Sequence, residues 1–246
     1  MLLTAADIRG VLHCHSDYSD GRGTIREMAL AAQARGWDYI GISDHSQAAF
    51  YAGGLTPDRV LEQHAEIDAV NAALAESGFR VLKGIEADIL ADGSIDYGDE
   101  LLATFDYVIG SVHSRFRMSE REMTDRVLAA LDSPWLTILG HPTGRLLLSR
   151  DPYAIDLEAV LDRAAARGVA VEINADPHRL DLDWRHVRGA LSRGITMEIG
   201  PDAHSERRLD YMPIGVGMAR KGWCTAGDVL NARSVEEVLR FARKSR

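Results

Sequence analysis

The segment Val11-Leu12-His13-Cys14-His15 ends a short apolar run with two histidines that lie two residues apart. Side chains alternate between the two faces of a strand, so His13 and His15 would share one face and Cys14 would point the other way. Two imidazoles on one face are what a bound metal ion needs. A His-x-His pair alone is a weak signal, however, so the rest of the chain must decide between a metal site and structural histidines.

Five further segments of the same kind also end in residues that bind divalent metals. Any one of these residues would more often be structural; Glu86, for example, could be a buried acid paired with an arginine. Coincidence in six separate segments is improbable, so we predict one shared metal site. The candidate ligands are His13, His15, Asp20, His45, Glu86, His113, His141, Asp202 and His204.

Strand-like runs alternate with helical patterns along the chain, which is typical of parallel βαβ units. Helix starts have capping boxes, such as Thr24 with Glu27, and glycines such as Gly36 follow the helices. Strands are expected near residues 10–15, 39–43, 81–86, 107–112, 136–140, 169–174 and 195–200. Helices are expected near 24–35, 57–76, 119–132, 156–167, 183–193 and 226–243, the last of them broken.

The candidate ligands follow nearly every expected strand. An open doubly wound sheet would concentrate its site at one switch point, and no glycine-rich phosphate loop follows the first strand. We therefore predict an α/β fold with a closed or nearly closed barrel, with the chemistry at the carboxyl ends of its strands. No linker, repeat or low-complexity stretch interrupts the pattern, so residues 1–246 are expected to form a single domain.

Composition limits the classes of function. The net charge of −9 argues against a dedicated nucleic-acid binder, although bound cations would balance part of the acidity. No apolar run approaches the roughly 20 residues that cross a bilayer, and no secretory signal is recognisable at the start. The two cysteines do not form a disulfide framework. We expect a cytoplasmic protein without a membrane partner.

The ligand series resembles the motifs of the polymerase and histidinol phosphatase (PHP) family of metal-dependent phosphoesterases, over essentially the whole chain. The matching segments are Leu12-His-Cys-His15, Ser19-Asp-Gly21, Ser43-Asp-His45, Gly84-Ile-Glu86, Gly110-Ser-Val-His113, Gly140-His-Pro142 and Asp202-Ala-His204. Within the family, the chain is most similar to the C-terminal PHP domain of bacterial family X DNA polymerases. That likeness includes Ala52-Gly-Gly-Leu55 and Leu139-Gly-His-Pro-Thr-Gly-Arg145.

The resemblance implies a seven-stranded, distorted TIM-like (β/α) barrel that holds three divalent metal ions, whether Zn, Mn or Fe. It implies a phosphate-ester substrate, such as a nucleotide, a DNA end or a small phosphomonoester, and leaves a polymerase partner open. The implied ligands are His13, His15, Glu86 and Asp202 for the first ion, Glu86, His113 and His141 for the second, and Asp20, His45 and His204 for the third.

Glu86 and Asp44 are the candidate catalytic residues. Hydrolysis would use a hydroxide that bridges two ions held by Glu86, so no side-chain nucleophile is required. Asp44 adjoins His45 but faces the other way in an extended segment. It is either a helix-cap or structural acid, or it acts by supporting a metal ligand or as a general acid.

Arg145, Arg115 and Arg150 are the candidate substrate-binding residues, with Arg145 as first choice. Each lies just past a ligand-bearing strand, and a guanidinium group suits phosphate. The alternative for each arginine is an ordinary surface ion pair. Asn174 and Asp176 follow the sixth strand and would line the rim of the site.

Three other functions compete with this interpretation. A histidinol-phosphate-type phosphatase would use the same chemistry. An amidohydrolase also begins with His-x-His, but it usually needs eight strands and a carboxylated lysine or an equivalent bridge. Lys83 is the lysine within a ligand-bearing strand, and it faces away from Glu86. A non-catalytic scaffold is disfavoured because all nine positions carry ligand-type residues.

We expect small or terminal phosphates as substrates and weak binding to duplex DNA.

Overall fold

Seven parallel strands form the centre of the protein. The computed structural model describes residues 1–243, and the strands follow one another in chain order around the sheet. Every neighbouring pair from the first strand to the seventh is parallel. The strands are β1 (Gly10–Val11), β2 (Tyr39–Ile42), β3 (Arg80–Asp88), β4 (Tyr107–Ser111), β5 (Ile138–Leu139), β6 (Ala170–Asn174) and β7 (Met197–Gly200).

The segments after β1 and β7 bring the two edges of the sheet together. The His15 amide donates to the Ala203 carbonyl at 2.9 Å, and the Ala203 amide donates to the His13 carbonyl at 3.2 Å. The predicted seven-stranded, nearly closed barrel is therefore confirmed. The regular part of β1 is shorter than predicted, and Cys14 beyond it forms an isolated bridge with Ala203. The Cys14 carbonyl also accepts a hydrogen bond at 2.7 Å from the amide of Ser43, the residue after β2.

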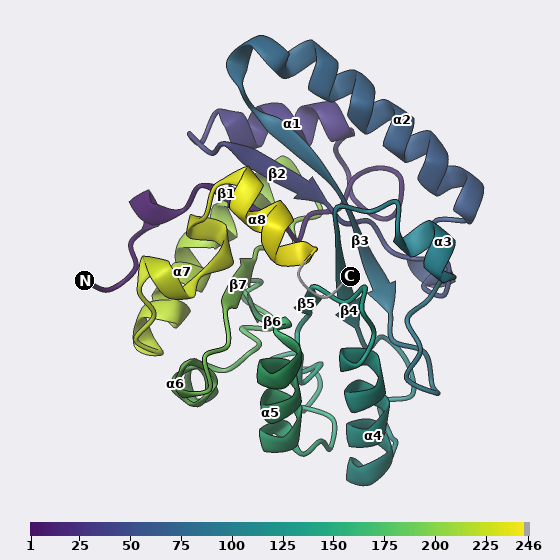
Figure 1. Ribbon diagram of the computed structural model, residues 1–246, viewed down its shortest axis with the longest axis vertical. Coiled ribbons are helices and arrows are strands. Elements are labelled where there is room, and N and C mark those ends of the chain that lie inside the picture. The colour runs from purple at the N-terminus through teal and green to yellow at the C-terminus, as the bar shows by residue number, and fades with distance from the viewer. Residues whose placement is uncertain (244–246) are drawn as a thin grey trace.

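Helices surround the strands, and α8 lies across one end of the barrel (Figure 1). The capping boxes at Thr24, Ser119 and Ser234 are present as predicted. The α-helices are α1 (Ile25–Gln33), α2 (Pro57–Leu74), α3 (Asp99–Leu102), α4 (Glu120–Leu131), α5 (Leu157–Arg167), α6 (Trp184–Ser192), α7 (Met212–Lys221) and α8 (Val235–Ala242). The 3-10 helices are η1 (Ala5–Asp7), η2 (Phe50–Ala52), η3 (Ala75–Ser77), η4 (Glu206–Tyr211), η5 (Ala226–Asp228) and η6 (Leu230–Ala232).

The helical elements confirm one sequence-based expectation and correct another. The helix expected over 226–243 is confirmed as broken, into η5, η6 and α8. Helix α7 was not predicted, because Pro213, Gly215 and Gly217 weaken the helical signal of its sequence. Its buried residues nevertheless pack the helix against the outer face of the sheet, and tertiary packing outweighs the poor propensity.

The interior of the barrel is apolar at its amino end. Tyr39, Tyr107 and Ile138 stand at the starts of their strands and pack with Val238 and Ala242 of α8. The ring of Tyr107 crosses the barrel, and its hydroxyl donates to the Leu12 carbonyl. Helix α8 thus plugs this end, and the polar side chains collect at the opposite, carboxyl end.

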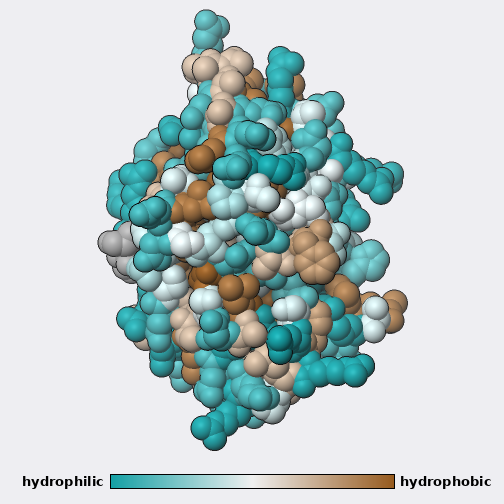
Figure 2. Space-filling view, turned by 90° about the vertical axis from the view of Figure 1, so that its right-hand side faces the viewer, coloured by the Kyte–Doolittle hydropathy of each residue, from teal (hydrophilic) through white to brown (hydrophobic). Residues whose placement is uncertain are grey.

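The outer surface is mainly polar. One face of the molecule carries hydrophilic side chains with hydrophobic ones scattered among them in small groups (Figure 2). Within residues 1–243, no helix combines the length and the apolar character that crossing a bilayer requires.

Candidate metal centre at the carboxyl ends of the strands

The structure brings the nine predicted ligands together at the carboxyl ends of the strands. The Asp20 loop folds back onto this cluster as expected, with an Asp20 oxygen 3.3 Å from His204 Nε2. Three subsets place ligand atoms within 4.8 Å of one another: His15, Asp20, His45 and His204; His13, His15 and Asp202; and His45, Glu86 and His113. We call the nine residues together the ligand cluster.

Glu86 lies at the centre of the ligand cluster. Its Oε2 is 3.1 Å from His45 Nδ1 and 3.3 Å from His13 Nε2. Its Oε1 is 2.9 Å from His141 Nε2 and 3.3 Å from His113 Nε2. The two oxygens therefore face different groups of imidazoles, which suits a carboxylate that bridges two cations.

His45 and His15 each contribute to more than one subset. His45 presents Nδ1 to Glu86 and Nε2 to Asp20, the latter at 3.6 Å. His15 presents Nε2 to Asp202 at 3.2 Å and Nδ1 to Asp20 at 4.0 Å. The resemblance assigned each of these histidines to one ion, whereas the geometry lets each face two candidate positions.

Several buried atoms of the ligand cluster have no hydrogen-bond partner among residues 1–243. They are Nε2 of His13, both ring nitrogens of His15, Nδ1 of His45, Nδ1 of His141 and Oε2 of Glu86. Leaving a buried polar atom unpaired costs free energy of about 1–3 kcal/mol. A cluster of such atoms therefore fits bound divalent cations, for which imidazole and carboxylate are suitable ligands.

Two carboxylates outside the ligand cluster orient its imidazoles. Glu172 on β6 accepts a hydrogen bond from His13 Nδ1 at 2.5 Å and from the His141 amide at 2.5 Å. Asp88 accepts from His113 Nδ1 at 2.7 Å. The rings of His13 and His113 are thereby held with Nε2 toward Glu86. Carboxylates commonly orient metal-ligating histidines in this way.

Sequence reasoning did not identify these two carboxylates, although both had a signal. Asp88 follows Glu86 by two residues and so shares its face of β3. Glu172 is an acid within the apolar run 169–173 and is fully buried. Asn174, which we expected at the rim, donates to Glu172 at 3.3 Å and to Asp202 at 3.2 Å.

Mutual electrostatics set the protonation of the buried ligands. Burial alone would lower the pKa of His13, but Glu172, Glu86 and Asp202 raise it well above its ordinary value. Burial alone would raise the pKa of Glu86, but His13 and His113 hold it well below its ordinary value. Without a cation, protons on the imidazoles balance the carboxylates, and cation binding would release those protons.

The same competition acts around Asp20. Burial and the neighbouring imidazoles of His204 and His45 lower the pKa of His15 to about 3. For His204, burial is outweighed by Asp20 and Asp202, which raise its pKa to about 9. The rings of His15 and His204 are stacked, with their centroids 4.2 Å apart. These two neighbouring imidazoles thus differ in charge.

Two ligands sit in the left-handed region of backbone conformation, which non-glycine residues rarely adopt. Asp202 has φ 49° and His141 has φ 22°. Such conformations are costly and are found preferentially at functional sites. The surrounding structure holds both residues there, which supports a functional constraint on their side chains.

Asp44 is fully buried beneath the Asp20 loop. It accepts hydrogen bonds from the Ser16 hydroxyl at 2.5 Å, the Ser19 hydroxyl at 2.5 Å and Gln63 Nε2 at 2.6 Å. Burial raises its pKa to about 6 against the effect of these bonds. Donors of the Asp20 loop and of α2 occupy both oxygens of Asp44. This arrangement suits a structural acid better than a general acid.

The arginines predicted to bind substrate hold loops at the rim. Arg145 pairs with Asp183 at 2.7 Å and donates to the Arg179 carbonyl at 2.8 Å. Arg150 donates to the Gly144 carbonyl at 2.7 Å and lies 3.9 Å over a phenyl ring, that of Phe116. Neither guanidinium contacts the ligand cluster. Arg115 is exposed on the loop after β4 with φ 55°.

Arg179 reaches the ligand cluster and was not predicted. Its Nε lies 3.2 Å from Asp202 Oδ2. Burial would lower its pKa, but Asp202 and Glu86 raise it. No sequence pattern marks this position, because the loop after β6 has no regular spacing. The bonds of Arg145 to the Arg179 and Leu180 carbonyls hold this loop in place.

Lys83 supports the distinction from an amidohydrolase site. Its ammonium group pairs with Asp68 of α2 at 2.7 Å, on the outer side of β3. The lysine therefore faces away from Glu86, as expected, and it lies outside the ligand cluster.

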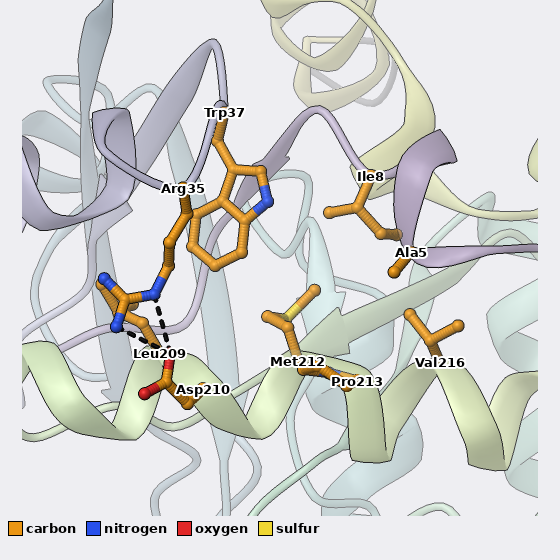
Figure 3. A pocket seen from close by; sticks show the side chains of 9 residues that line it. All are labelled: Ala5, Ile8, Arg35, Trp37, Leu209, Asp210, Met212, Pro213 and Val216. Atoms are coloured by element: carbon orange, nitrogen blue, oxygen red, sulfur yellow. Dashed lines mark hydrogen bonds and ion pairs between the residues drawn. The ribbon is translucent and has the colours of Figure 1, made fainter.

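A hollow elsewhere in the molecule is lined by residues that do not belong to the ligand cluster (Figure 3). Arg35 donates to Asp210 at 2.7 Å along one edge of this hollow. The rest of its lining is apolar. The remaining lining residues are Ala5, Ile8, Trp37, Leu209, Met212, Pro213 and Val216.

The fold and the ligand cluster define a parallel α/β barrel with a candidate multi-metal site. The chain belongs to the PHP domain family, whose model matches residues 12–176. Over 244 residues it is 45% identical to the DNA polymerase/3'-5' exonuclease PolX of Bacillus subtilis. That match covers 99% of this chain and 42% of the Bacillus protein, so the chain spans less than half of that relative.

Other relatives are named as probable phosphatases. One from Caldanaerobacter subterraneus is 32% identical over 197 residues, covering 74% of this chain and 70% of that protein. Among solved structures, the histidinol phosphate phosphatase of Lactococcus lactis, complexed with zinc, L-histidinol and phosphate, has a TM-score of 0.64. It is 20% identical and the match covers 88% of this chain and 94% of that chain, which establishes the shared fold.

Proposed function

We propose that this protein is a metal-dependent phosphoesterase with a site for up to three divalent ions. One observation carries the proposal: both oxygens of the buried Glu86 carboxylate face imidazoles, at distances from 2.9 to 3.6 Å. A histidine shell around a central carboxylate suits Zn, Mn or Fe better than Mg or Ca.

The ligand cluster would hold the ions as follows. Glu86 would bridge two positions, one shared with His13 and Asp202 and the other with His113 and His141. Asp20 and His204 would serve a third position, with His15 and His45 between the sites. When bound, the ions would supply a water nucleophile of lowered pKa and positive charge for the phosphate oxygens.

The remaining residues of the site would bind and orient. Arg179 lies beside Asp202 and carries a permanent positive charge, which suits a non-bridging oxygen of the phosphate. Glu172 and Asp88 would keep the His13 and His113 rings aimed at Glu86. Asp44 would hold the loop that carries Asp20.

The proposed substrates are small or terminal phosphate esters, including the ends of nucleic-acid strands. Two features support this class: relatives named as phosphatases and as a 3'-5' exonuclease, and a net charge of −9 that would repel a long duplex. Among residues 1–243, Arg179 is the arginine whose guanidinium contacts a candidate ligand, so it is the arginine proposed to bind the phosphate of such a substrate.

A substrate panel tests the proposal directly. Protein reconstituted with Mn or Zn would be assayed on p-nitrophenyl phosphate, bis-p-nitrophenyl phosphate, histidinol phosphate and a short single strand with a free 3' end. We expect metal-dependent hydrolysis of at least one phosphate ester, lost in Glu86→Gln. Turnover that is indifferent to metal, or retained in Glu86→Gln, would contradict the proposal. The preferred substrate separates a strand-end nuclease from a histidinol-phosphate-type phosphatase.

A further inference from the structure

Two aromatic side chains project into solvent from the turn η2. Phe50 is 84% exposed and Tyr51 is 63% exposed. Their rings meet edge to face, with centroids 6.0 Å apart. Leaving this much apolar surface in water is unfavourable, so an adjacent exposed pair is a candidate binding surface.

The loop that carries the pair is firmly attached to the ligand cluster. Its two ends meet where the Leu55 amide donates to the carbonyl of His45, a candidate ligand, at 2.9 Å. The Tyr97 hydroxyl accepts from the Gln47 amide at 3.2 Å and donates to the Leu55 carbonyl at 2.5 Å. Both arms of the loop are thus held by Tyr97, and the aromatic pair is preorganised next to the site.

The turn η2 lies against the loop that carries Asp20. A Cβ atom added at Gly53, two residues after Tyr51, would lie 3.4 Å from the Ser19 carbonyl oxygen. Partial burial, followed by the negative charges of Asp88, Glu86 and Asp20, raises the pKa of the Tyr51 phenol to about 12. The aromatic pair therefore adjoins the segment that brings Asp20 to the ligand cluster.

We propose that Phe50 and Tyr51 form a stacking platform for the terminal nucleobase of a single nucleic-acid strand whose phosphate ester lies at the ligand cluster. This inference rests on the proposed function and names its substrate. Every base has a π-face, so stacking on aromatic side chains binds strand ends without sequence preference. An acidic protein gains little affinity from phosphate contacts along a strand, which leaves stacking as the main source of affinity for the end.

The test uses metal-reconstituted protein and two short DNA strands. One strand has 2-aminopurine as its 3'-terminal base, and the other has an abasic residue at the same position. A terminal phosphorothioate linkage slows cleavage while binding is measured by quenching of 2-aminopurine fluorescence, which stacking causes. Cleavage of the corresponding natural strands gives KM and kcat.

The variant is the double substitution Phe50→Ala and Tyr51→Ala. We expect it to lose the quenching and to raise KM for the base-ended strand about tenfold or more, with the abasic strand unaffected. Tyr51→Phe keeps the ring and should retain the quenching. The matched control is Trp223→Ala, which removes an aromatic side chain that is 64% exposed. Trp223 belongs to a different segment: the carbonyl of its neighbour Cys224 accepts a hydrogen bond from the amide of Leu3, which precedes β1.

The outcomes separate this inference from the proposed function. Equal KM values for the two strands in the wild type, or quenching that survives the double substitution, would overturn the platform even if cleavage is normal. Quenching that depends on the pair in a protein that cleaves no phosphate ester would support the platform and sink the phosphoesterase proposal. Loss of quenching in Trp223→Ala as well would also count against the platform.

Discussion

Glu86 is the residue on which the candidate site converges. Its side chain is 1% exposed and its two oxygens face five imidazoles, those of His13, His15, His45, His113 and His141. A carboxylate in this position neutralises the imidazolium charges when no cation is present and would bridge cations when they bind. Its removal should therefore affect more than one bound ion.

We predict that Glu86→Ala will lose hydrolysis and bind fewer ions than single-residue variants of His113 or His141, with the fold retained. Glu86 would serve two positions through its two oxygens, whereas His113 and His141 would each serve one. Elemental analysis of purified protein gives the ion count, and circular dichroism checks the fold. Wild-type turnover in Glu86→Ala would show that the proposed geometry is wrong.

Arg179 is the residue that we expect to bind phosphate. Arg179→Met should raise KM for a phosphomonoester by roughly 10- to 100-fold, because a hydrogen bond to a charged group contributes about 1.5–3 kcal/mol. Arg179→Lys should restore part of the loss, and Arg188→Met on α6 is the control. Steady-state kinetics and metal content are measured together. A variant that loses ions but keeps its KM would assign Arg179 to support of Asp202 instead.

At the scale of elements, the strands deliver the ligands and the adjoining elements fix them. Strand β3 carries Glu86 and Asp88 on one face, and β6 adds Glu172 beneath the His13 ring. Helix α2 contributes Gln63, which donates to Asp44 at 2.6 Å. The same helix contains a buried histidine, His64, that packs edge-on against Phe105 with centroids 4.9 Å apart.

His64 should make the stability of the protein depend on pH. Burial, helped by Lys83, lowers its pKa from 6.5 to about 4. Between these two values the unfolded chain binds the proton more tightly, so stability is present above pH 6.5 and is lost as pH falls toward about 4.

We predict that His64→Gln will reduce this loss by about 1 kcal/mol between pH 7.5 and about pH 5, after allowing for partial solvent screening. Urea unfolding of wild type and variant at the two pH values gives the comparison, in which the titration of the ligand cluster cancels. An identical loss of stability in both proteins would show that His64 does not contribute.

For the whole molecule, metal binding and folding should be coupled. The nine ligands come from segments between residues 13 and 204, so bound ions would tie together nearly the whole barrel. Ions that bind the folded state and not the unfolded chain would stabilise it, and saturation at about 100 times Kd would add about 2.7 kcal/mol per site. Chelation should then lower Tm by roughly 5–10 °C for each ion that is removed. Calorimetry with and without chelator measures it, and an unchanged Tm would exclude tightly held ions.

The charge of the whole molecule should select single-stranded over duplex substrates. With a net charge of −9, the protein meets electrostatic repulsion from a long duplex, and its arginines near the site largely bind their own loops. We predict weaker binding of a duplex than of a short single strand of the same sequence. Fluorescence anisotropy at physiological salt measures both. Submicromolar binding of the duplex would overturn this expectation.

The ligands are predictable from the sequence because local rules place them. A strand alternates its faces with period two, and parallel strands present their carboxyl ends at one edge, so spacing along the chain is enough to predict that His13, Glu86 and His141 converge. Repeated strand and helix patterns likewise predict seven parallel strands. The broken last helix was expected. Helix α7 was not predicted, because its glycines and proline have low helix propensity and the helix is stabilised by packing.

The sequence by itself determined the order of the strands, the barrel class and the candidate metal ligands, because each depends on spacing along the chain. Only the tertiary structure decided which polar groups meet. Arg179 faces Asp202, Arg145 is taken by Asp183, and both oxygens of Asp44 are occupied by the Asp20 loop and α2. These pairings join segments far apart in sequence, and their partners are chosen by the path of loops that have no periodic pattern. The physical reason is that hydrogen bonds and ion pairs depend on distances of about 3 Å, which only the packed chain defines.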